Sequence, residues 1–208
     1  HSVPVHPMMI ARIHDEELRG LGYTFITPEW YEGTEAAIQK LCVGKAVGTD
    51  VPFRELQLVE ADLASLRYRL SQDEIDRYRI LSQKTAQALE ATCREMMPGW
   101  KEHEIPAHLA AKVIKEGIRP SVLLVATDER IFNYRHPIPT DKRLEKYAMV
   151  VLCGEKWGLI SNATRFVHFG ALPEELMENK QKLATIDTAM CAATRPGTSV
   201  KHIFQVAL

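Results

Sequence analysis

The sequence predicts an α+β fold in which antiparallel strands pack against long helices. Patterns typical of helices and strands occur in the order helix, helix, strand, loop, strand, strand, helix, helix from residue 61 to residue 208. The last two strands adjoin through a short polar turn in VVLCGEKWGLISNATRFVHFG (residues 150–170), which is typical of an antiparallel hairpin. Long helices on both sides of antiparallel strands indicate the α+β class.

The first long helix begins at Ser71, because Ser71 and Glu74 have the spacing of a capping box. It ends at Pro98 and Gly99, since proline cannot continue a helix and glycine adopts the left-handed turn. A second helix follows and ends at Gly117. Apolar residues at helical spacing predict the buried faces, which are Ile75, Tyr78, Ala86, Leu89, Cys93 and Met96 in the first helix and Ile105, Leu109 and Val113 in the second.

The remaining elements follow in order. SVLLVATD (residues 121–128) is a short apolar run and predicts a buried strand. Residues 129–146 form a polar loop with two prolines, and the hairpin comes next. A third helix has Pro173 in its first turn and runs to about Thr194. Thr198 is placed to cap a fourth helix.

Residues 1–60 show weaker patterns. HDEELRGLG and PEWYEGTEAAIQKLCVG predict short helices that each end at a glycine, and KAVGTDVPF predicts a strand and a turn. This stretch is small, and its periodicity is weak. It therefore predicts the remnant of a domain rather than a complete one.

Composition narrows the classes of partner. The chain carries 26 Lys and Arg against 27 Asp and Glu. It has no excess of basic residues, which a nucleic-acid-binding protein would be expected to show. Its apolar runs are too short to cross a membrane, and its first residues, HSVPVHPMMIARIHDEE, lack the pattern of a secretion signal. The four cysteines are widely spread and form no CxxC pair, which indicates reduced thiols in a cytoplasmic protein.

Several catalytic motifs are excluded. HEIPAH is close to the zinc motif HExxH, but His103 and His108 lie about 140° apart around a helix and cannot share one ion. No GxSxG elbow and no phosphate-binding loop occurs. Cys153 and Cys191 stand in apolar runs and are predicted to be core thiols.

One polar cluster remains. NYRHP places Arg135 and His136 in the long loop before the hairpin. Long loops between core elements often carry function, and histidine is the usual proton-transfer residue at neutral pH. A solvated Arg and His in an exposed loop is the alternative.

From about Leu66 to the end, the chain resembles the pita-bread family of creatinase, aminopeptidase P and prolidase. The resemblance rests on the order and spacing of five stretches, namely LRYRLSQDEIDRYRILSQKTAQALEA, PGWKEHEIPAHLA, HPIPTDKRLEKYAMVV, NATRFVHFG and ATRPGTSV. It implies that residues 61–208 are the N-terminal half of a pita-bread domain, whose C-terminal half would lie beyond Leu208. It also implies that residues 1–60 are the remnant of a creatinase-type N-terminal domain.

The resemblance also implies where metal ligands would stand. Peptidases of the family hold two metal ions with two hairpin aspartates, followed by a histidine and two glutamates further along. The aspartate positions fall on Val151 and Asn162. Valine offers no ligand atom and an amide oxygen is a weak one, so we expect no metal and no cofactor.

Two functions follow from the resemblance. The first is a metal-independent hydrolase, similar to creatinase, that cleaves a C–N bond of a small amidino compound or a peptide. His136 is then the catalytic residue, Arg135 holds a substrate carboxylate, and Asn162 and Arg165 bind substrate. The alternative is a non-catalytic pita-bread domain that binds a peptide or protein partner. Either way, the resemblance implies a homodimer, and the charge balance and short apolar runs predict no nucleic-acid or membrane partner.

Overall fold

The computed structural model describes residues 7–29 and 31–208. Residues 1–6 lie outside the described residues, and so does Trp30, which belongs to the predicted helix PEWYEGTEAAIQKLCVG. Contacts divide the chain into two units, the first ending at Arg69 and the second running from Leu70 to Leu208. The sequence placed a domain boundary after residue 60. None of the described helices is long and apolar enough to cross a membrane.

The first unit has short elements and no fully buried residue among those described. Its two strands are two residues each and pair in parallel. Of the first predicted helix, HDEELRGLG, only the first four residues are helical, as part of a single turn of π-helix, and the second is confined to α2. The elements are α1 (Pro7–Arg12), η1 (Ile13–Glu17), α2 (Glu35–Cys42), β1 (Gly48–Thr49), β2 (Gln57–Leu58) and α3 (Glu60–Leu66).

The second unit begins with helix α4 (Gln72–Glu95), and its predicted capping box is confirmed. The Ser71 backbone N–H donates to the Glu74 carboxylate at 2.7 Å, and the Glu74 backbone N–H donates to the Ser71 hydroxyl at 3.3 Å. Helix α5 (Glu104–Ile114) buries Ile105, Leu109 and Val113 as predicted. On α4 the prediction is right for Leu89, and Met96 directly after the helix is buried as predicted, whereas Tyr78 is exposed. The other buried residues of α4 are Leu81, Thr85, Ala88 and Thr92.

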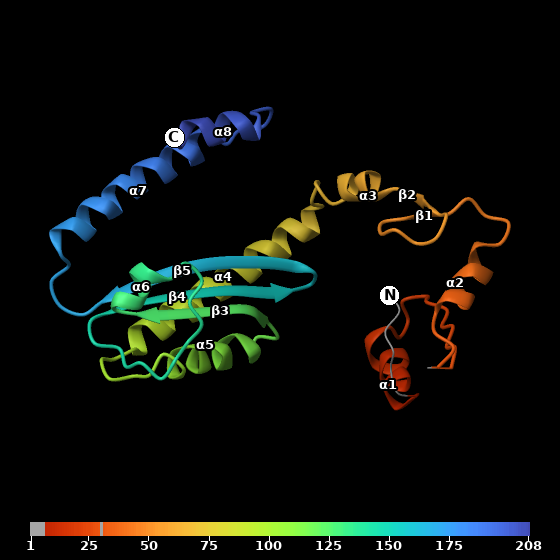
Figure 1. Cartoon of the computed structure of the whole chain (residues 1–208), viewed down its shortest axis with the longest axis horizontal. Coiled ribbons are helices and arrows are strands. Elements are labelled where there is room, and N and C mark those ends of the chain that lie inside the picture. Colours follow the sequence, from red (N-terminus) through yellow and green to blue (C-terminus); the bar gives the residue numbers. More distant parts are fainter. Residues whose placement is uncertain (1–6, 30) are drawn as a thin grey trace. The chain divides into compact units, whose positions relative to one another are not determined.

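Three antiparallel strands form the sheet, in the order β3–β4–β5 (Figure 1). They are β3 (Arg119–Thr127), β4 (Tyr147–Lys156) and β5 (Leu159–His168), and the short helix α6 (Glu129–Asn133) follows β3. Trp157 and Gly158 form the two-residue turn of the predicted hairpin, with φ values of +56° and +73°. Positive φ at both positions is typical of a type I′ turn, whose twist matches that of the strands.

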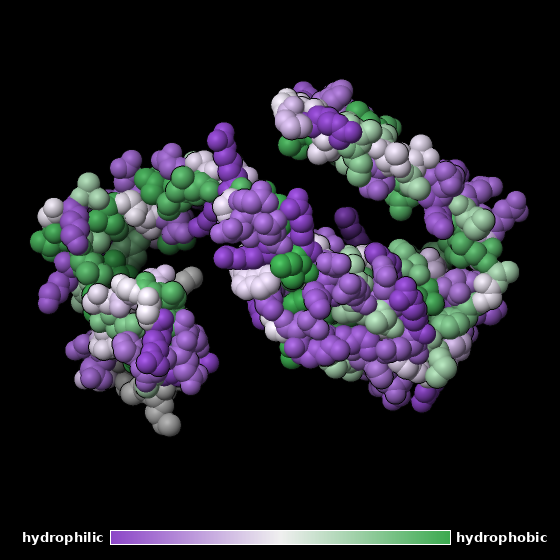
Figure 2. All heavy atoms as spheres, turned by 180° about the vertical axis from the view of Figure 1, so that it is seen from behind, coloured by the Kyte–Doolittle hydropathy of each residue, from purple (hydrophilic) through white to green (hydrophobic). Residues whose placement is uncertain are grey.

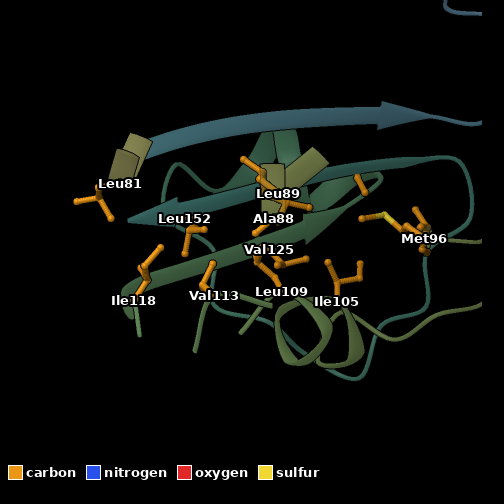
Figure 3. Packing of buried hydrophobic residues seen from close by; sticks show 13 residues of the cluster. Leu81, Ala88, Leu89, Met96, Ile105, Leu109, Val113, Ile118, Val125 and Leu152 are labelled. Carbon is orange, nitrogen blue, oxygen red and sulfur yellow. The ribbon is translucent and has the colours of Figure 1, made fainter. Parts of the chain in front are cut away.

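Helices α4 and α5 pack against one face of this sheet. Alternate residues of β4 point to that face, and Ala148, Val150 and Leu152 are fully buried there. They join the apolar residues of α4 and α5 in one cluster (Figure 3). Gly154 continues the series, and a Cβ atom at this position would lie 2.7 Å from the Thr85 hydroxyl, so the close approach of α4 requires glycine.

The opposite face of the sheet, called the far face below, carries the other set of alternate residues. Several of its apolar side chains are exposed, with Val122 at 38 %, Ile160 at 49 % and Phe166 at 53 %. The far face therefore differs from the helix-covered face, which lies within the core. In the view of Figure 2, surface hydrophobic side chains are frequent on the first unit, while the second unit is mainly hydrophilic.

Helices α7 (Glu174–Ala193) and α8 (Val200–Val206) complete the second unit, and neither has a fully buried residue. Pro173 precedes α7 as its N-cap rather than lying in its first turn. The predicted cap at Thr198 is wrong by one residue, because the Ser199 hydroxyl accepts the His202 backbone N–H at 3.2 Å. Cys191 is exposed on α7, so the prediction of a core thiol there is wrong.

Candidate functional site

The register of the β4–β5 hairpin decides which residues share the far face. Val151 pairs with Thr164, and Cys153 pairs with Asn162. Directly opposed residues of an antiparallel pair point to the same side, as do residues two apart in one strand. These four side chains therefore lie together on the far face. Cys153 lies directly opposite Asn162. Val151 is a diagonal neighbour of Asn162, and the spacing of such residues is roughly 7–8 Å.

The loop between α6 and β4 carries Arg135 and His136, and residues 134–146 are called the His136 loop below. Both side chains are exposed, whereas the neighbouring Pro137 is buried. Arg130 of α6 fastens the loop, because its guanidinium donates to the Ile138 carbonyl at 2.8 Å and lies 5.2 Å from the centre of the Tyr134 ring. Arg135 and His136 thus lie at the surface between Tyr134 and Ile138, which both contact Arg130.

Asp128 anchors the other end of the His136 loop. Its carboxylate accepts the backbone N–H groups of Glu145, Lys146 and Tyr147 at 2.8 to 3.0 Å. Asp128 also has a positive φ of +52°, which is a strained conformation for a residue other than glycine. The sequence analysis missed this residue, although a polar residue at the end of an apolar strand was the available signal.

Lys142 adds an ion pair beside this anchor. Its ammonium lies 3.1 Å from the Glu129 carboxylate and 4.0 Å from that of Asp128. The hydrogen bond to Glu129 raises the pKa of Lys142 above its usual value. The pKa of Glu129 is lowered, chiefly by a hydrogen bond from its own backbone N–H and next by Lys142.

Arg165 lies on the other face of the sheet from Asn162. It pairs with Val150 of β4, and its guanidinium lies 3.3 Å from the Glu90 carboxylate of α4. The half-buried Cys93 of α4 belongs to the same surroundings, and burial raises the pKa of its thiol while Arg165 opposes that rise. Arg165 therefore does not join Asn162. His136 shares no hydrogen bond with Asn162 in the described part of the chain.

A group of rings stands at the end of the far face next to α6. Tyr147 is central, with ring centres of Phe132, Phe166 and His168 at 6.1, 5.7 and 5.6 Å. Burial raises the pKa of the Tyr147 hydroxyl. Sequence reasoning did not find this group, because its members come from three separate elements.

The family model that matches this sequence is described as metallopeptidase family M24, and the match spans residues 76–208. It includes α5, the His136 loop, the hairpin, α7 and α8. The chain belongs to metallopeptidase family M24. The resemblance inferred from the sequence is thereby confirmed.

Solved structures of M24-like proteins have the same fold. Prolidase from Pyrococcus horikoshii OT3 has a TM-score of 0.75 at 20 % identity, over 85 % of this chain and 56 % of that chain. Dipeptidase PepE from Mycobacterium ulcerans has a TM-score of 0.73 at 17 % identity, over 97 % and 59 %. X-Pro aminopeptidase from Thermotoga maritima has a TM-score of 0.72 at 17 % identity, over 88 % and 57 %.

These similarities confirm the predicted α+β, pita-bread-like fold. The chain spans less than two thirds of the length of each of these structures. The search of curated proteins found no match.

The hairpin of this M24 chain does not fit a pair of metal ions. The side chains of Val151, Cys153, Asn162 and Thr164 are an isopropyl group, a thiol, an amide and a hydroxyl, and the one carboxylate beside them on this face of the hairpin, that of Glu155, is ion-paired with Arg119. Paired divalent ions need several anionic ligands that bridge or flank them. Among residues 7–29 and 31–208, no group of three or more His, Cys, Asp or Glu is placed to hold a metal ion.

Proposed function

We propose that this M24 protein is a hydrolase that cleaves a C–N bond of a small amidino compound or a peptide without a paired-metal site. The observation that carries the proposal is the chemistry of the far face, where Asn162 faces Cys153 and the neighbouring carboxylate, that of Glu155, is held in an ion pair with Arg119. The family supplies the reaction class. The hairpin chemistry supports a route that depends on side chains alone.

In this proposal His136 is the proton-transfer residue. Its ring accepts a proton from the attacking water and returns it to the nitrogen that leaves, so that the C–N bond breaks with protons balanced. Arg135, next in the loop, binds a substrate carboxylate through its two-pronged guanidinium. Asn162 binds the substrate by hydrogen bonds from the far face. Arg165 could bind substrate only if its guanidinium left the Glu90 carboxylate and contacted the substrate instead.

Hydrolysis measured in the presence of a metal chelator tests the proposal. The substrates are X-Pro dipeptides and creatine-like amidino compounds, and the variants are His136→Ala and, as the matched control, His202→Ala in α8. We expect turnover that resists the chelator, is lost in His136→Ala and remains in His202→Ala. Turnover that requires added metal, or that survives His136→Ala, contradicts the proposal.

A second function is favoured by the far face itself. Exposed apolar side chains at Val122, Ile160 and Phe166 suit contact with another chain. A non-catalytic M24 domain that binds a peptide or protein partner would use such a face. Binding of X-Pro peptides without any turnover would favour it over the hydrolase.

The structure also supports proposals about the oligomeric state and the cellular location of the protein. We propose a homodimer, because the exposed apolar residues of the far face lose contact with water when two copies associate. We also propose a cytoplasmic protein, since Cys42, Cys93, Cys153 and Cys191 are all free thiols.

A further inference from the structure

A fully buried carboxylate lies beneath the His136 loop. Glu102, just before α5, has 0 % exposure. One carboxylate oxygen accepts the backbone N–H and the hydroxyl of Thr127 at 2.7 and 3.0 Å and the Arg130 side chain at 3.1 Å. The other oxygen accepts the backbone N–H and the hydroxyl of Thr140 at 2.9 and 2.7 Å. All five partners are donors, which suits a carboxylate, since it only accepts hydrogen bonds when ionised.

These partners belong to the three segments that surround Arg135 and His136. Thr127 ends β3, Arg130 lies in α6, and Thr140 lies at the middle of the His136 loop. Arg130 is a relay as well, because the same guanidinium that contacts Glu102 also donates to the Ile138 carbonyl. Glu102 therefore connects the loop to the sheet at Thr140 directly and at Ile138 through Arg130.

The backbone around Glu102 strengthens this connection. The Glu102 N–H donates to the Lys142 carbonyl at 2.9 Å, and the Leu144 N–H donates to the Trp100 carbonyl at 2.8 Å. The end of the His136 loop is thus paired, as in a short ladder, with the segment that carries Glu102. Arg135 and His136 themselves make no hydrogen bond or ion pair in the described part of the chain, so their positions depend on these backbone attachments.

We propose that Glu102 is a positioning residue that holds the His136 loop, and with it Arg135 and His136, in one conformation. The proposal rests on the proposed function in giving His136 a chemical role, but the clamp itself does not require that role. A buried carboxylate with five donors is costly to replace, because each donor would lose its acceptor away from water. The loop therefore has one strongly favoured arrangement.

Hydrogen–deuterium exchange of the full chain tests the clamp without a substrate. Thr140→Val removes one hydroxyl donor to Glu102, whereas Thr140→Ser keeps it and serves as the matched control. Glu102→Gln disturbs the whole network. We expect amides of residues 134–146 to exchange faster, on the order of tenfold, in Thr140→Val and Glu102→Gln. The strand β4 and helix α4 should keep their protection, and Thr140→Ser should behave as the parent does.

Equal loop exchange in the parent and in Thr140→Val overturns the proposal, and so does equal exchange in Thr140→Ser and Thr140→Val. Thr140→Val decides the matter if Glu102→Gln does not fold. In the hydrolysis assay, Thr140→Val should lower kcat and Thr140→Ser should restore it. Faster loop exchange in Thr140→Val together with full turnover in His136→Ala would refute the proposed function and leave the clamp intact.

Discussion

Cys153 and Asn162 face each other across the β4–β5 hairpin, on the side of the sheet that α4 and α5 do not cover. This relationship follows from the two-residue turn at Trp157 and Gly158, which fixes the register of both strands. The family resemblance places the two aspartate positions of the hairpin on Val151 and Asn162. The register shows that this pair is diagonal and that the direct partner of Asn162 is a thiol.

Purified protein should retain no pair of divalent ions. Around Asn162 the far face offers one thiol, one amide and one hydroxyl, and the neighbouring Glu155 carboxylate is ion-paired with Arg119. A thiol and neutral oxygens do not bridge two ions as carboxylates do. Elemental analysis after dialysis is the measurement. About two equivalents of Mn, Co or Zn per chain, the ratio expected of a paired-metal site, would contradict the prediction.

Thr85→Val should stabilise the second unit. The Thr85 hydroxyl is fully buried against Gly154, and it has no hydrogen-bond partner among the described residues. Replacing it with a methyl group removes an unpaired polar group at nearly constant volume, and we expect a gain of about 1 kcal/mol in the free energy of unfolding. Urea unfolding measures it. Thr92→Val is the control, because the Thr92 hydroxyl is also buried but donates to the Ala88 carbonyl at 2.9 Å. Equal losses of unfolding free energy in Thr85→Val and Thr92→Val would show that the Thr85 hydroxyl has a hydrogen-bond partner in solution.

The capping box of α4 should make stability depend on pH in the acid range. Hydrogen bonds from the Ser71 backbone and hydroxyl lower the pKa of Glu74 below its usual value. A carboxyl group with a lowered pKa in the folded state stabilises above its unfolded pKa, and this contribution is lost as the pH falls through the folded pKa. Melting temperatures between about pH 5 and pH 3 should fall more steeply in the parent than in Glu74→Gln, which has no group to titrate. Parallel curves would contradict this prediction.

The protein should associate through the far face. Phe166 is 53 % exposed there and stacks on Tyr147, so it presents apolar area at the surface. Light scattering at high concentration should show a homodimer, and Phe166→Ser should shift the equilibrium toward monomer. Phe204→Ser is the control, since Phe204 of α8 is exposed outside the sheet. A monomeric parent protein would count against the dimer.

Features encoded in short stretches were predictable from the sequence. Ser71 and Glu74 are three residues apart, so the capping box needed no knowledge of distant residues. The buried face of α5 followed from its spacing in the same way. The cap of α8 was harder, because Thr198 and Ser199 are both suitable caps and the choice depends on backbone angles.

Features that depend on long-range contact were not predictable. Asp128 anchors residues more than a dozen positions later, and Glu102 contacts Thr140 across the fold. For Arg165, by contrast, the sequence already contained the answer. It lies three residues after Asn162 in one strand, so the period of two already places the two on opposite faces. The family resemblance, rather than the periodicity, had grouped them into one site.

Restoring carboxylates to the hairpin distinguishes the direct pair from the diagonal one. Cross-strand partners have Cβ atoms about 4.5–5.5 Å apart, against roughly 7–8 Å for diagonal neighbours. Cys153→Asp with Asn162→Asp therefore places two carboxylates where one ion can bridge them. Val151→Asp with Asn162→Asp, the pair that the family resemblance indicates, separates them further. Both double variants should lose stability in metal-free buffer, because each places two like charges close together on the far face.

Added Mn²⁺ or Zn²⁺ should raise the melting temperature of the direct pair more than that of the diagonal pair, since an ion that binds only the folded state stabilises by mass action. Cys153→Asn is the control, because it changes the thiol without adding charge. If the diagonal pair gains more, the hairpin adjusts its register to the family spacing, and Val151 occupies the ligand position after all. If neither double variant gains more than Cys153→Asn does, the far face at this level of the hairpin is not where an M24 metal site would form.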